Sequence, residues 1–244
     1  MHTFGLIGYP LSHTFSPTYF SEKFYQEGIE ATTYHAFPLP SIEDLPELIE
    51  KTPNLEGLNV TIPYKEAVIP FLDAISEEAE AIGAVNTIRI DKDGKKTGFN
   101  TDVYGFEMSL KPFLKSHHQK ALILGTGGAA KAVSYVLQKL NIECRLVSRS
   151  PSGGQLNYKD INEEVMRTHH LLVNTTPLGM APKIHDFPDV PYEFVNEKHL
   201  FFDLIYNPEK TVFLIKGNLK GAAFKNGLEM LYLQAERSWE IWNA

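Results

Sequence analysis

A glycine-rich turn near the middle of the chain constrains the possible fold more than any other feature. The segment Gly125–Ala130 reads Gly-Thr-Gly-Gly-Ala-Ala; it follows an apolar run at Ala121–Leu124, and apolar residues then recur at helical spacing. Gly125 permits a tight turn, Gly127 lets the backbone approach a pyrophosphate, and the small Ala130 lets the helix pack closely on the strand. An ordinary strand–turn–helix without a ligand is the alternative. The flanking elements favour a dinucleotide-binding turn at a helix N-terminus, within a doubly wound α/β domain.

The end of the next predicted strand indicates which dinucleotide this turn would bind. A site for NAD usually has Asp or Glu about 20 residues beyond the glycines, where the carboxylate binds the ribose 2′-hydroxyl. This chain has Ser148-Arg149-Ser150 there, at the end of the predicted strand Glu143–Ser148. A guanidinium suits a 2′-phosphate, so the sequence favours NADP over NAD, and a solvated surface arginine is the alternative. The predicted cofactor-binding residues of the turn and of this strand end are Gly125, Gly127, Gly128, Ala129, Ser148, Arg149 and Ser150.

The domain organisation follows from length and from the alternation of strands and helices. The 244 residues suit two modest α/β domains. We expect a substrate domain at 1–102, a nucleotide-binding domain at 103–227, and a C-terminal helix over about 228–244 that packs back on the first domain. The predicted strands, besides the two already named, are Phe4–Ile7, Thr33–Phe37, Leu58–Ile62, Leu171–Asn174, Phe201–Leu204 and a hairpin of Asn86–Asp91 with Lys96–Asn100. The further predicted helices are Ser16–Glu27, Ser41–Ile49, Glu66–Leu72, Glu77–Ile82, Tyr104–Leu114 and Met230–Trp242.

Composition and charge argue against several classes of protein. The net charge is −7 without a basic block, so we expect a small-molecule substrate and no nucleic-acid partner. No run of about 18 apolar residues occurs and the N-terminus lacks a leader pattern, so neither a membrane span nor a signal peptide is predicted. The single cysteine excludes a disulfide within the chain and favours the cytoplasm. No metal site is predicted, the pairs His117–His118 and His169–His170 are expected at the surface, and we expect a monomer or homodimer.

Three polar clusters interrupt the apolar pattern of the first domain. In Ser12–Pro17, the hydroxyls of Thr14 and Ser16 stand beside a helix N-terminus and could bind a carboxylate; a plain N-cap at Ser16 is the alternative. In Asn59–Lys65, polar residues mark the carboxyl end of a strand, where α/β sheets place ligands. Lys65 then falls at a predicted helix start, and a solvent-exposed lysine is the alternative.

The third cluster consists of Gly83–Thr87 and Gly98–Asp102. Asn86 and Asp102 stand in polar breaks beside apolar segments. Asp102 also falls where the chain is expected to cross into the nucleotide-binding domain, and helix capping is its alternative role.

In order and spacing, these motifs closely resemble the shikimate dehydrogenase family, and the resemblance extends over nearly the whole chain. Further matching segments are Asn174–Met180, Asp203–Pro208 with Thr211, and Gly227–Leu231 with Gln234. The resemblance implies an N-terminal α/β substrate domain and a Rossmann-like NADP-binding domain. It also implies the reversible reduction of 3-dehydroshikimate to shikimate with NADPH, in the biosynthesis of aromatic amino acids.

The resemblance further implies a role for each matching position. Lys65 and Asp102 correspond to the catalytic pair, and Thr175 corresponds to a cofactor contact. The positions that hold substrate hydroxyls are Asn59, Thr61, Asn86 and Gln234. The positions that hold its carboxylate are Ser16, Tyr206 and Thr14, which replaces the family's usual serine. Two alternatives are an NAD-using quinate/shikimate dehydrogenase, which would want an acidic residue near Arg149, and a non-catalytic nucleotide-binding relative, which would lack Lys65 or Asp102.

Overall fold

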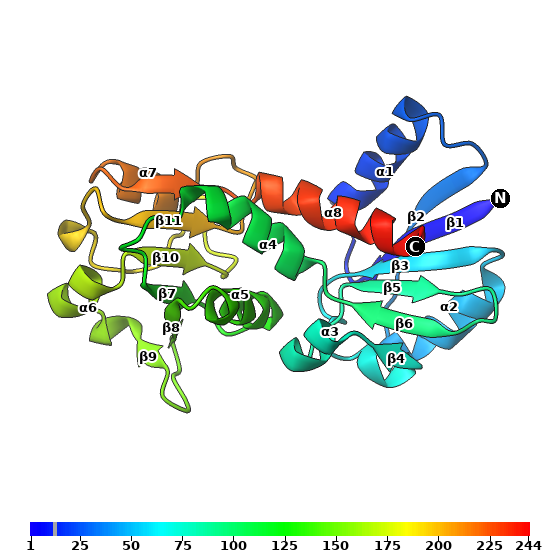
Figure 1. The fold of residues 1–244 in the computed structure, drawn as a ribbon, viewed down its shortest axis with the longest axis horizontal. Coiled ribbons are helices and arrows are strands. Elements are labelled where there is room, and N and C mark those ends of the chain that lie inside the picture. The colour runs from blue at the N-terminus through cyan, green and yellow to red at the C-terminus, as the bar shows by residue number, and fades with distance from the viewer. Residues whose placement is uncertain (12–13) are drawn as a thin grey trace. The chain divides into compact units, whose positions relative to one another are not determined.

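The computed structural model describes residues 1–11 and 14–244, and the chain divides into two compact units. Unit 1 consists of Met1–Thr101 with Ala235–Ala244, and unit 2 consists of Asp102–Gln234. Each unit is built on its own six-stranded sheet, and Figure 1 labels the strands of both except β12. The predicted fold class, a two-domain α/β protein, is confirmed.

The sheet of unit 1 is mixed, with the strand order β2-β1-β3-β5-β6-β4. Its strands are β1 (His2–Gly8), β2 (Thr32–Pro38), β3 (Leu55–Val60), β4 (Ala74–Ile75), β5 (Thr87–Ile90) and β6 (Lys96–Phe99), and its helices are α1 (Phe15–Gln26), α2 (Leu45–Lys51) and α3 (Glu77–Ile82). β1 is parallel to β2 and β3, whereas β5 is antiparallel to β3 and β6. The carboxyl ends of β1, β3 and β6 therefore share one edge of the sheet with the start of β5. We call this the polar edge of unit 1.

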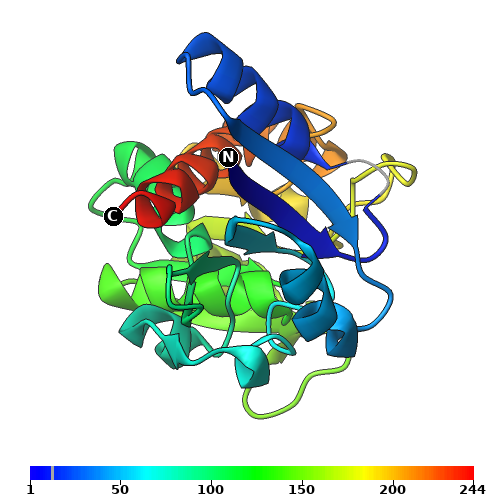
Figure 2. The same cartoon turned by 90° about the vertical axis from the view of Figure 1, so that its right-hand side faces the viewer.

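The second half of the last helix, α8 (Leu228–Trp242), belongs to unit 1 and is held there by aromatic packing. The Trp242 ring stacks on Phe4 of β1 at 4.8 Å between centroids and lies 5.4 Å from the ring of Phe20 in α1. Its Nε1 donates to the carbonyl oxygen of Ile88 at 2.9 Å. In Figure 2, α1 and the end of α8 lie next to β1 and β2. The apolar stripe of the terminal helix thus completes the core of unit 1.

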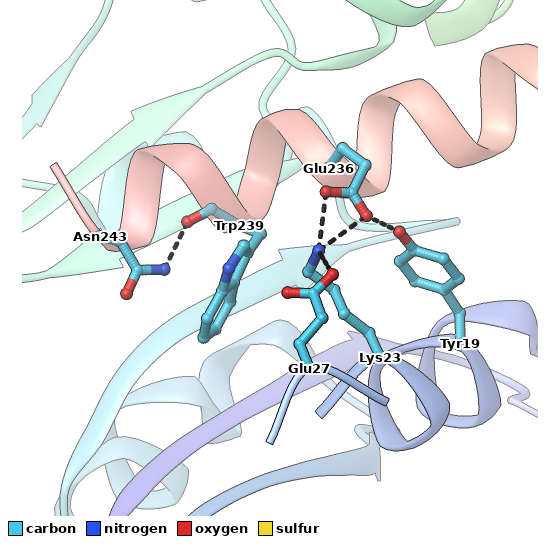
Figure 3. A network of polar contacts seen from close by, with 6 residues as sticks. All are labelled: Tyr19, Lys23, Glu27, Glu236, Trp239 and Asn243. Atoms are coloured by element: carbon cyan, nitrogen blue, oxygen red, sulfur yellow. Dashed lines mark hydrogen bonds and ion pairs between the residues drawn. The ribbon is translucent and has the colours of Figure 1, made fainter. Parts of the chain in front are cut away.

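An ion-pair cluster joins the same two helices at the margin of this aromatic core. Lys23 of α1 has only 8% of its side chain exposed, and its Nζ lies 2.7 Å from Glu27 and 2.9 Å from Glu236 of α8. The hydroxyl of Tyr19 donates to the same Glu236 carboxylate, as Figure 3 shows. A buried ammonium needs such partners, because an unpaired buried charge is strongly destabilising.

Unit 2 is a doubly wound sheet in which every strand pairing is parallel, with the order β12-β11-β10-β7-β8-β9. Its strands are β7 (Lys120–Leu124), β8 (Glu143–Ser148), β9 (Leu156–Asn157), β10 (Leu171–Asn174), β11 (Leu200–Asp203) and β12 (Ala223–Lys225). Its helices are α4 (Asp102–Leu110), α5 (Gly128–Lys139), α6 (Glu163–Thr168), α7 (Val212–Asn218) and the first half of α8. The strand order reverses between β7 and β10, the point where sheets of this kind bind dinucleotides.

One predicted helix is wrong, and two others are right in part. The segment Glu66–Leu72 is a series of turns that ends in a short 3₁₀ helix at Ile69–Phe71, so Lys65 does not stand at a helix start. Pro70 explains this, because it lacks an N–H and its ring would clash with a helical carbonyl four residues earlier. Proline acts in the same way on the predicted Tyr104–Leu114, where α4 ends at Leu110 and a 3₁₀ turn containing proline follows. The helix predicted from Ser41 begins as a 3₁₀ turn and continues as α2.

The predicted surface position of the histidine pairs is wrong for one member of each pair, whereas His117 and His170 are only partly buried. His118 and His169 are each 5% exposed, and His199 is 1% exposed. His118 and His199 find backbone partners on both ring nitrogens, which lets these polar rings lie inside the unit. Strands β4, β9 and β12 escaped prediction because two or three residues carry no measurable periodicity.

Candidate functional site

The polar edge of unit 1 is organised by the carboxamides of Asn59 and Asn86, which are 5% and 3% exposed. Asn59 precedes the last residue of β3, and Asn86 precedes the first residue of β5. The Asn86 carbonyl accepts from the Val60 N–H at 2.8 Å, which joins the end of β3 to the start of β5. Asn59 Nδ2 donates to the hydroxyls of Thr87 and Ser238 at 3.2 and 3.0 Å. Buried amides of this kind must be hydrogen-bonded, and these are.

Thr61 and Lys65 follow β3 along this edge. The Thr61 N–H donates to the Ile7 carbonyl at 2.9 Å, and the Thr61 methyl lies so close to Gly8 that a Cβ there would approach it to 2.5 Å. The absence of a side chain at Gly8 therefore lets Thr61 sit against the end of β1. The Lys65 carbonyl accepts from the N–H of Val85 at 2.7 Å, which anchors the Lys65 backbone one residue from Asn86.

Asp102 comes shortly after the carboxyl end of β6, which belongs to the same polar edge. The Thr101 N–H donates to Asn86 Oδ1 at 2.7 Å, and Asn86 Nδ2 donates to the Thr101 hydroxyl at 3.0 Å. Asp102 comes next in the chain and opens α4, where its carboxylate suits the positive end of a helix dipole. Asp102 thus lies in the first turn of α4, a position that leaves a catalytic role open.

The hydroxyls predicted to bind a carboxylate stand at the start of α1. Thr14 is the N-cap residue, and its side chain makes no capping hydrogen bond. Ser16 lies in the first turn and is hydrogen-bonded to the Tyr34 side chain, so the alternative of a plain N-cap at Ser16 is wrong. Ser12 and His13 of the same motif lie outside the described residues.

The glycine turn of unit 2 connects β7 to α5 and rests on the end of β10. Gly125 has a φ of 120°, and a Cβ there would lie 2.5 Å from the Thr175 hydroxyl. That hydroxyl donates to the Leu124 carbonyl at 2.8 Å, and the Thr175 N–H donates to the same oxygen at 3.0 Å. Thr175, which directly follows β10, thus binds the end of β7 where the turn begins. These two hydrogen bonds hold it beside the predicted cofactor loop.

The space beside the rest of the turn is open. Such space is what a bound dinucleotide would require. Among residues 1–11 and 14–244, a Cβ at Gly127 or Gly128 would meet no heavy atom within 4 Å beyond the local backbone and the adjacent residues. Gly127 has a φ of −79°, which any residue adopts, so neither packing nor backbone strain requires glycine there. A phosphate bound against the N–H groups at the start of α5, next to Ala129, would require that space. The turn therefore fits a dinucleotide.

The predicted 2′-phosphate contacts lie at the end of β8. Arg149 and Ser150 are exposed, and the Ser150 N–H donates to Ser148 Oγ at 3.2 Å. The Arg149 carbonyl accepts from Asn157 Nδ2 at 3.3 Å, which ties this segment to the end of β9. The Arg149 backbone is thus anchored, while its side chain is exposed to solvent.

A buried carboxylate that the sequence analysis left without a role holds the ends of β10 and β11 together. Asp203 accepts from Asn174 Nδ2 at 3.0 Å, from the Thr211 hydroxyl at 2.6 Å and from the Ile205 N–H at 3.0 Å. Burial raises the pKa of the Asp203 carboxyl to about 6, against these hydrogen bonds. The network supports the loops that carry Thr175 and Tyr206. The sequence could have indicated this network, because the family motifs that match this chain include Asn174, Asp203 and Thr211.

Tyr206 and Gln234 complete the predicted substrate residues. Burial raises the pKa of the Tyr206 phenol, so its hydroxyl remains a neutral donor. Gln234 Nε2 donates to the Leu231 carbonyl at 2.9 Å on α8. A Cβ at Gly105 of α4 would lie 3.2 Å from the Gln234 Cβ, so the missing side chain lets the two helices cross at Gln234.

The described residues show neither a metal-binding cluster nor a helix suited to a membrane. Within residues 1–11 and 14–244, no three His, Cys, Asp or Glu side chains are grouped so as to hold a metal ion. In the same part of the chain, no helix combines the length and apolar character that a bilayer span requires.

Comparison with known proteins gives a consistent result. Residues 6–88 match the family model of the shikimate dehydrogenase substrate binding domain. An NADP(+) shikimate dehydrogenase of Carboxydothermus hydrogenoformans is 40% identical, over 98% of this chain and 90% of its own length. The shikimate 5-dehydrogenase of Thermus thermophilus, solved with NADP(H) and shikimate, has a TM-score of 0.87 and 33% identity, over 99% of this chain and 93% of that one. A quinate dehydrogenase of Corynebacterium glutamicum, solved with NAD, has a TM-score of 0.87 at 27% identity, over 99% of this chain and 93% of that one.

Proposed function

Because the chain belongs to the shikimate dehydrogenase family, we propose that it catalyses the reversible, NADP-dependent reduction of 3-dehydroshikimate to shikimate. The observation that carries this proposal is the polar edge of unit 1. There the backbone N–H of Val85 holds the carbonyl of Lys65, and the carboxamide of the next residue, Asn86, binds the N–H of Thr101, which precedes Asp102. The backbones that carry the two ionisable residues of the family motifs are thus anchored at two consecutive residues.

The proposed chemistry assigns Lys65 and Asp102 to the proton. The reduced cofactor supplies a hydride to the substrate ketone. Negative charge then develops on the ketone oxygen, and a proton must reach it. Lys65 donates a hydrogen bond and then the proton to this oxygen, while Asp102 orients the ammonium and accepts from the adjacent hydroxyl.

The remaining residues bind and orient the two ligands. Thr14, Ser16 and Tyr206 hold the substrate carboxylate, and the side chains that hold its ring hydroxyls are Asn59, Thr61, Asn86 and Gln234. The cofactor phosphates bind the turn of Gly125, Gly127, Gly128 and Ala129, next to Thr175. Arg149, with Ser148 and Ser150, holds the 2′-phosphate. The open space above Gly127 and the exposed guanidinium support these assignments.

One assay tests the proposal against the NAD-using quinate alternative. Initial rates are measured with shikimate or quinate, each with NADP or NAD. We expect the highest kcat/KM for shikimate with NADP. A preference for quinate with NAD would support the alternative, and the absence of turnover with all four pairs would support a non-catalytic relative. We further propose that the enzyme works in the cytoplasm as a monomer or homodimer.

A further inference from the structure

The Tyr34 hydroxyl joins the two groups of side chains that the proposed function assigns to the substrate. Tyr34 lies on β2, is 7% exposed, and stacks on Phe20 at 4.6 Å between ring centroids. Its hydroxyl donates to Asn59 Oδ1 at 2.7 Å and is also hydrogen-bonded to Ser16. Burial raises the pKa of Tyr34, so the phenol stays neutral and keeps its proton for Asn59.

The other end of the Asn59 carboxamide is fixed as well. Its Nδ2 donates to Ser238 Oγ at 3.0 Å, and that hydroxyl lies 2.8 Å from Thr87 Oγ1 and 3.2 Å from Thr101 Oγ1. Ser238 is fully buried and comes from α8, one helical turn after Gln234. The same Nδ2 faces the Asn86 backbone carbonyl at 3.4 Å, and a flipped Asn59 would place its Oδ1 there instead, so that two acceptors would face each other.

We propose that Tyr34 is a positioning residue for the substrate. Its hydroxyl fixes the Ser16 hydroxyl and the Asn59 carboxamide at a set separation, so that the carboxylate and the ring hydroxyls of one shikimate molecule are bound together. The inference rests on the proposed function, because that function assigns Ser16 and Asn59 to shikimate. Tyr34 acts through these two residues and takes no part in the proton transfer.

The test is Tyr34→Phe, which removes the hydroxyl and keeps the ring in its stack. The matched control is Tyr19→Phe, which removes a phenol hydroxyl of unit 1 that contacts Glu236 rather than Asn59 (Figure 3). Calorimetric titration should show that Tyr34→Phe binds shikimate about tenfold more weakly, or about 1.4 kcal/mol. The control should change this Kd by less than about twofold. Because the proposed role concerns ground-state binding of substrate, kcat and the KM for NADP should stay within about twofold in both variants.

A double-mutant cycle shows whether Tyr34 acts through Asn59. In the Asn59→Ala background, the loss caused by Tyr34→Phe should shrink at least about threefold, because one of its two bonds no longer exists. An undiminished loss, or a Tyr34→Phe affinity equal to that of Tyr19→Phe, would overturn the inference.

Two further outcomes are decisive. If Tyr34→Phe does not fold, Ser238→Ala, which frees the other end of the Asn59 carboxamide, should weaken shikimate binding instead; an unchanged Kd there overturns the inference. Wild-type protein that neither binds nor oxidises shikimate would overturn both the proposed function and the inference. Wild-type turnover with unchanged affinity in the variants would overturn the inference alone.

Discussion

The two units hold their candidate residues in opposite ways. In unit 1, Asn59 and Asn86 are buried, and their carboxamides are held by neighbouring hydroxyls at 3.0–3.2 Å. In unit 2, the glycine turn offers backbone N–H groups beneath open space, and Arg149 is exposed. A small hydroxylated substrate requires side chains at set positions, whereas a phosphate is bound by backbone and charge. Removing a side chain should therefore damage the buried polar site of unit 1, whereas adding one should damage the glycine turn of unit 2.

The units also differ in which of their buried polar groups titrate. The network around Ser238 in unit 1 consists of amides and hydroxyls, which keep their charge between acid and neutral pH. Unit 2 buries Asp203 and three histidines, which change charge in that range. Mild acid should therefore leave the Ser238 network intact and act on the histidine sites of unit 2, while in unit 1 it acts on the carboxylates that pair with Lys23.

The largest expected effect is in unit 1, for Lys65→Ala. General acid–base catalysis contributes about 10²–10⁴-fold to a rate, so kcat for shikimate oxidation should fall at least about a hundredfold, with a far smaller change in KM. Asp102→Asn should be similarly impaired, and the double mutant should be little worse than either single, because the two residues act as one device. Steady-state kinetics on the three variants measures this. A Lys65→Ala enzyme that keeps its kcat and loses only affinity would make Lys65 a binding residue.

The second effect is on cofactor choice in unit 2. Arg149→Ala removes one charge-assisted contact, worth roughly 1.5–3 kcal/mol, so the KM for NADP should rise about ten- to a hundredfold. The KM for NAD should hardly change, because NAD has no 2′-phosphate. Equal increases for both cofactors would show that Arg149 supports the fold of the β8 end rather than selecting NADP.

A third change tests directly whether adding a group damages unit 2. Gly127→Ala places a methyl where, apart from the adjacent residues, no described atom lies within 4 Å, at a φ of −79° that alanine adopts without strain. Thermal melting should be unchanged, while the KM for NADP should rise about tenfold, or about 1.4 kcal/mol. Gly125→Ala is the contrasting variant, because its Cβ would lie 2.5 Å from Thr175 and should lower the Tm as well. Normal cofactor kinetics in Gly127→Ala would show that the cofactor phosphates do not bind at this turn.

The fold was largely predictable from sequence because its signals are local. The glycine turn, the apolar stripe of α5 and the aromatic end of α8 are each visible within about 15 residues. The network around Asn59 was not predictable, since Ser238 stands 179 positions away and no local pattern shows which side chains meet. The buried histidines were missed for the same reason, because Lys198 and Met166 supply their partners from other segments.

The smallest expected effect concerns those histidines. Burial lowers the pKa of His118 from 6.5 to about 4, with further lowering from the nearby His117, His170 and Lys115. The neutral ring is satisfied on both sides, since Nε2 donates to the Lys198 carbonyl at 3.0 Å and Nδ1 accepts from the Lys115 N–H at 3.0 Å. A proton on Nδ1 would face that N–H. The folded state therefore resists protonation that the unfolded chain accepts.

The sign of the pH effect follows from these two values. As the pH falls below 6.5, the unfolded state takes up a proton first, so stability is lost between 6.5 and about 4. Between about pH 7 and 5.5, His118 should account for a loss of about 1 kcal/mol in the free energy of unfolding. Urea titrations at the two pH values measure the free energy of unfolding. Between them, the wild type should lose about 1 kcal/mol more than His118→Gln does. The exposed His185→Gln serves as the control. The raised pKa of Asp203 acts in the opposite direction in both chains, so it cancels in the difference. Equal losses in wild type and His118→Gln would show that His118 does not make unit 2 sensitive to acid.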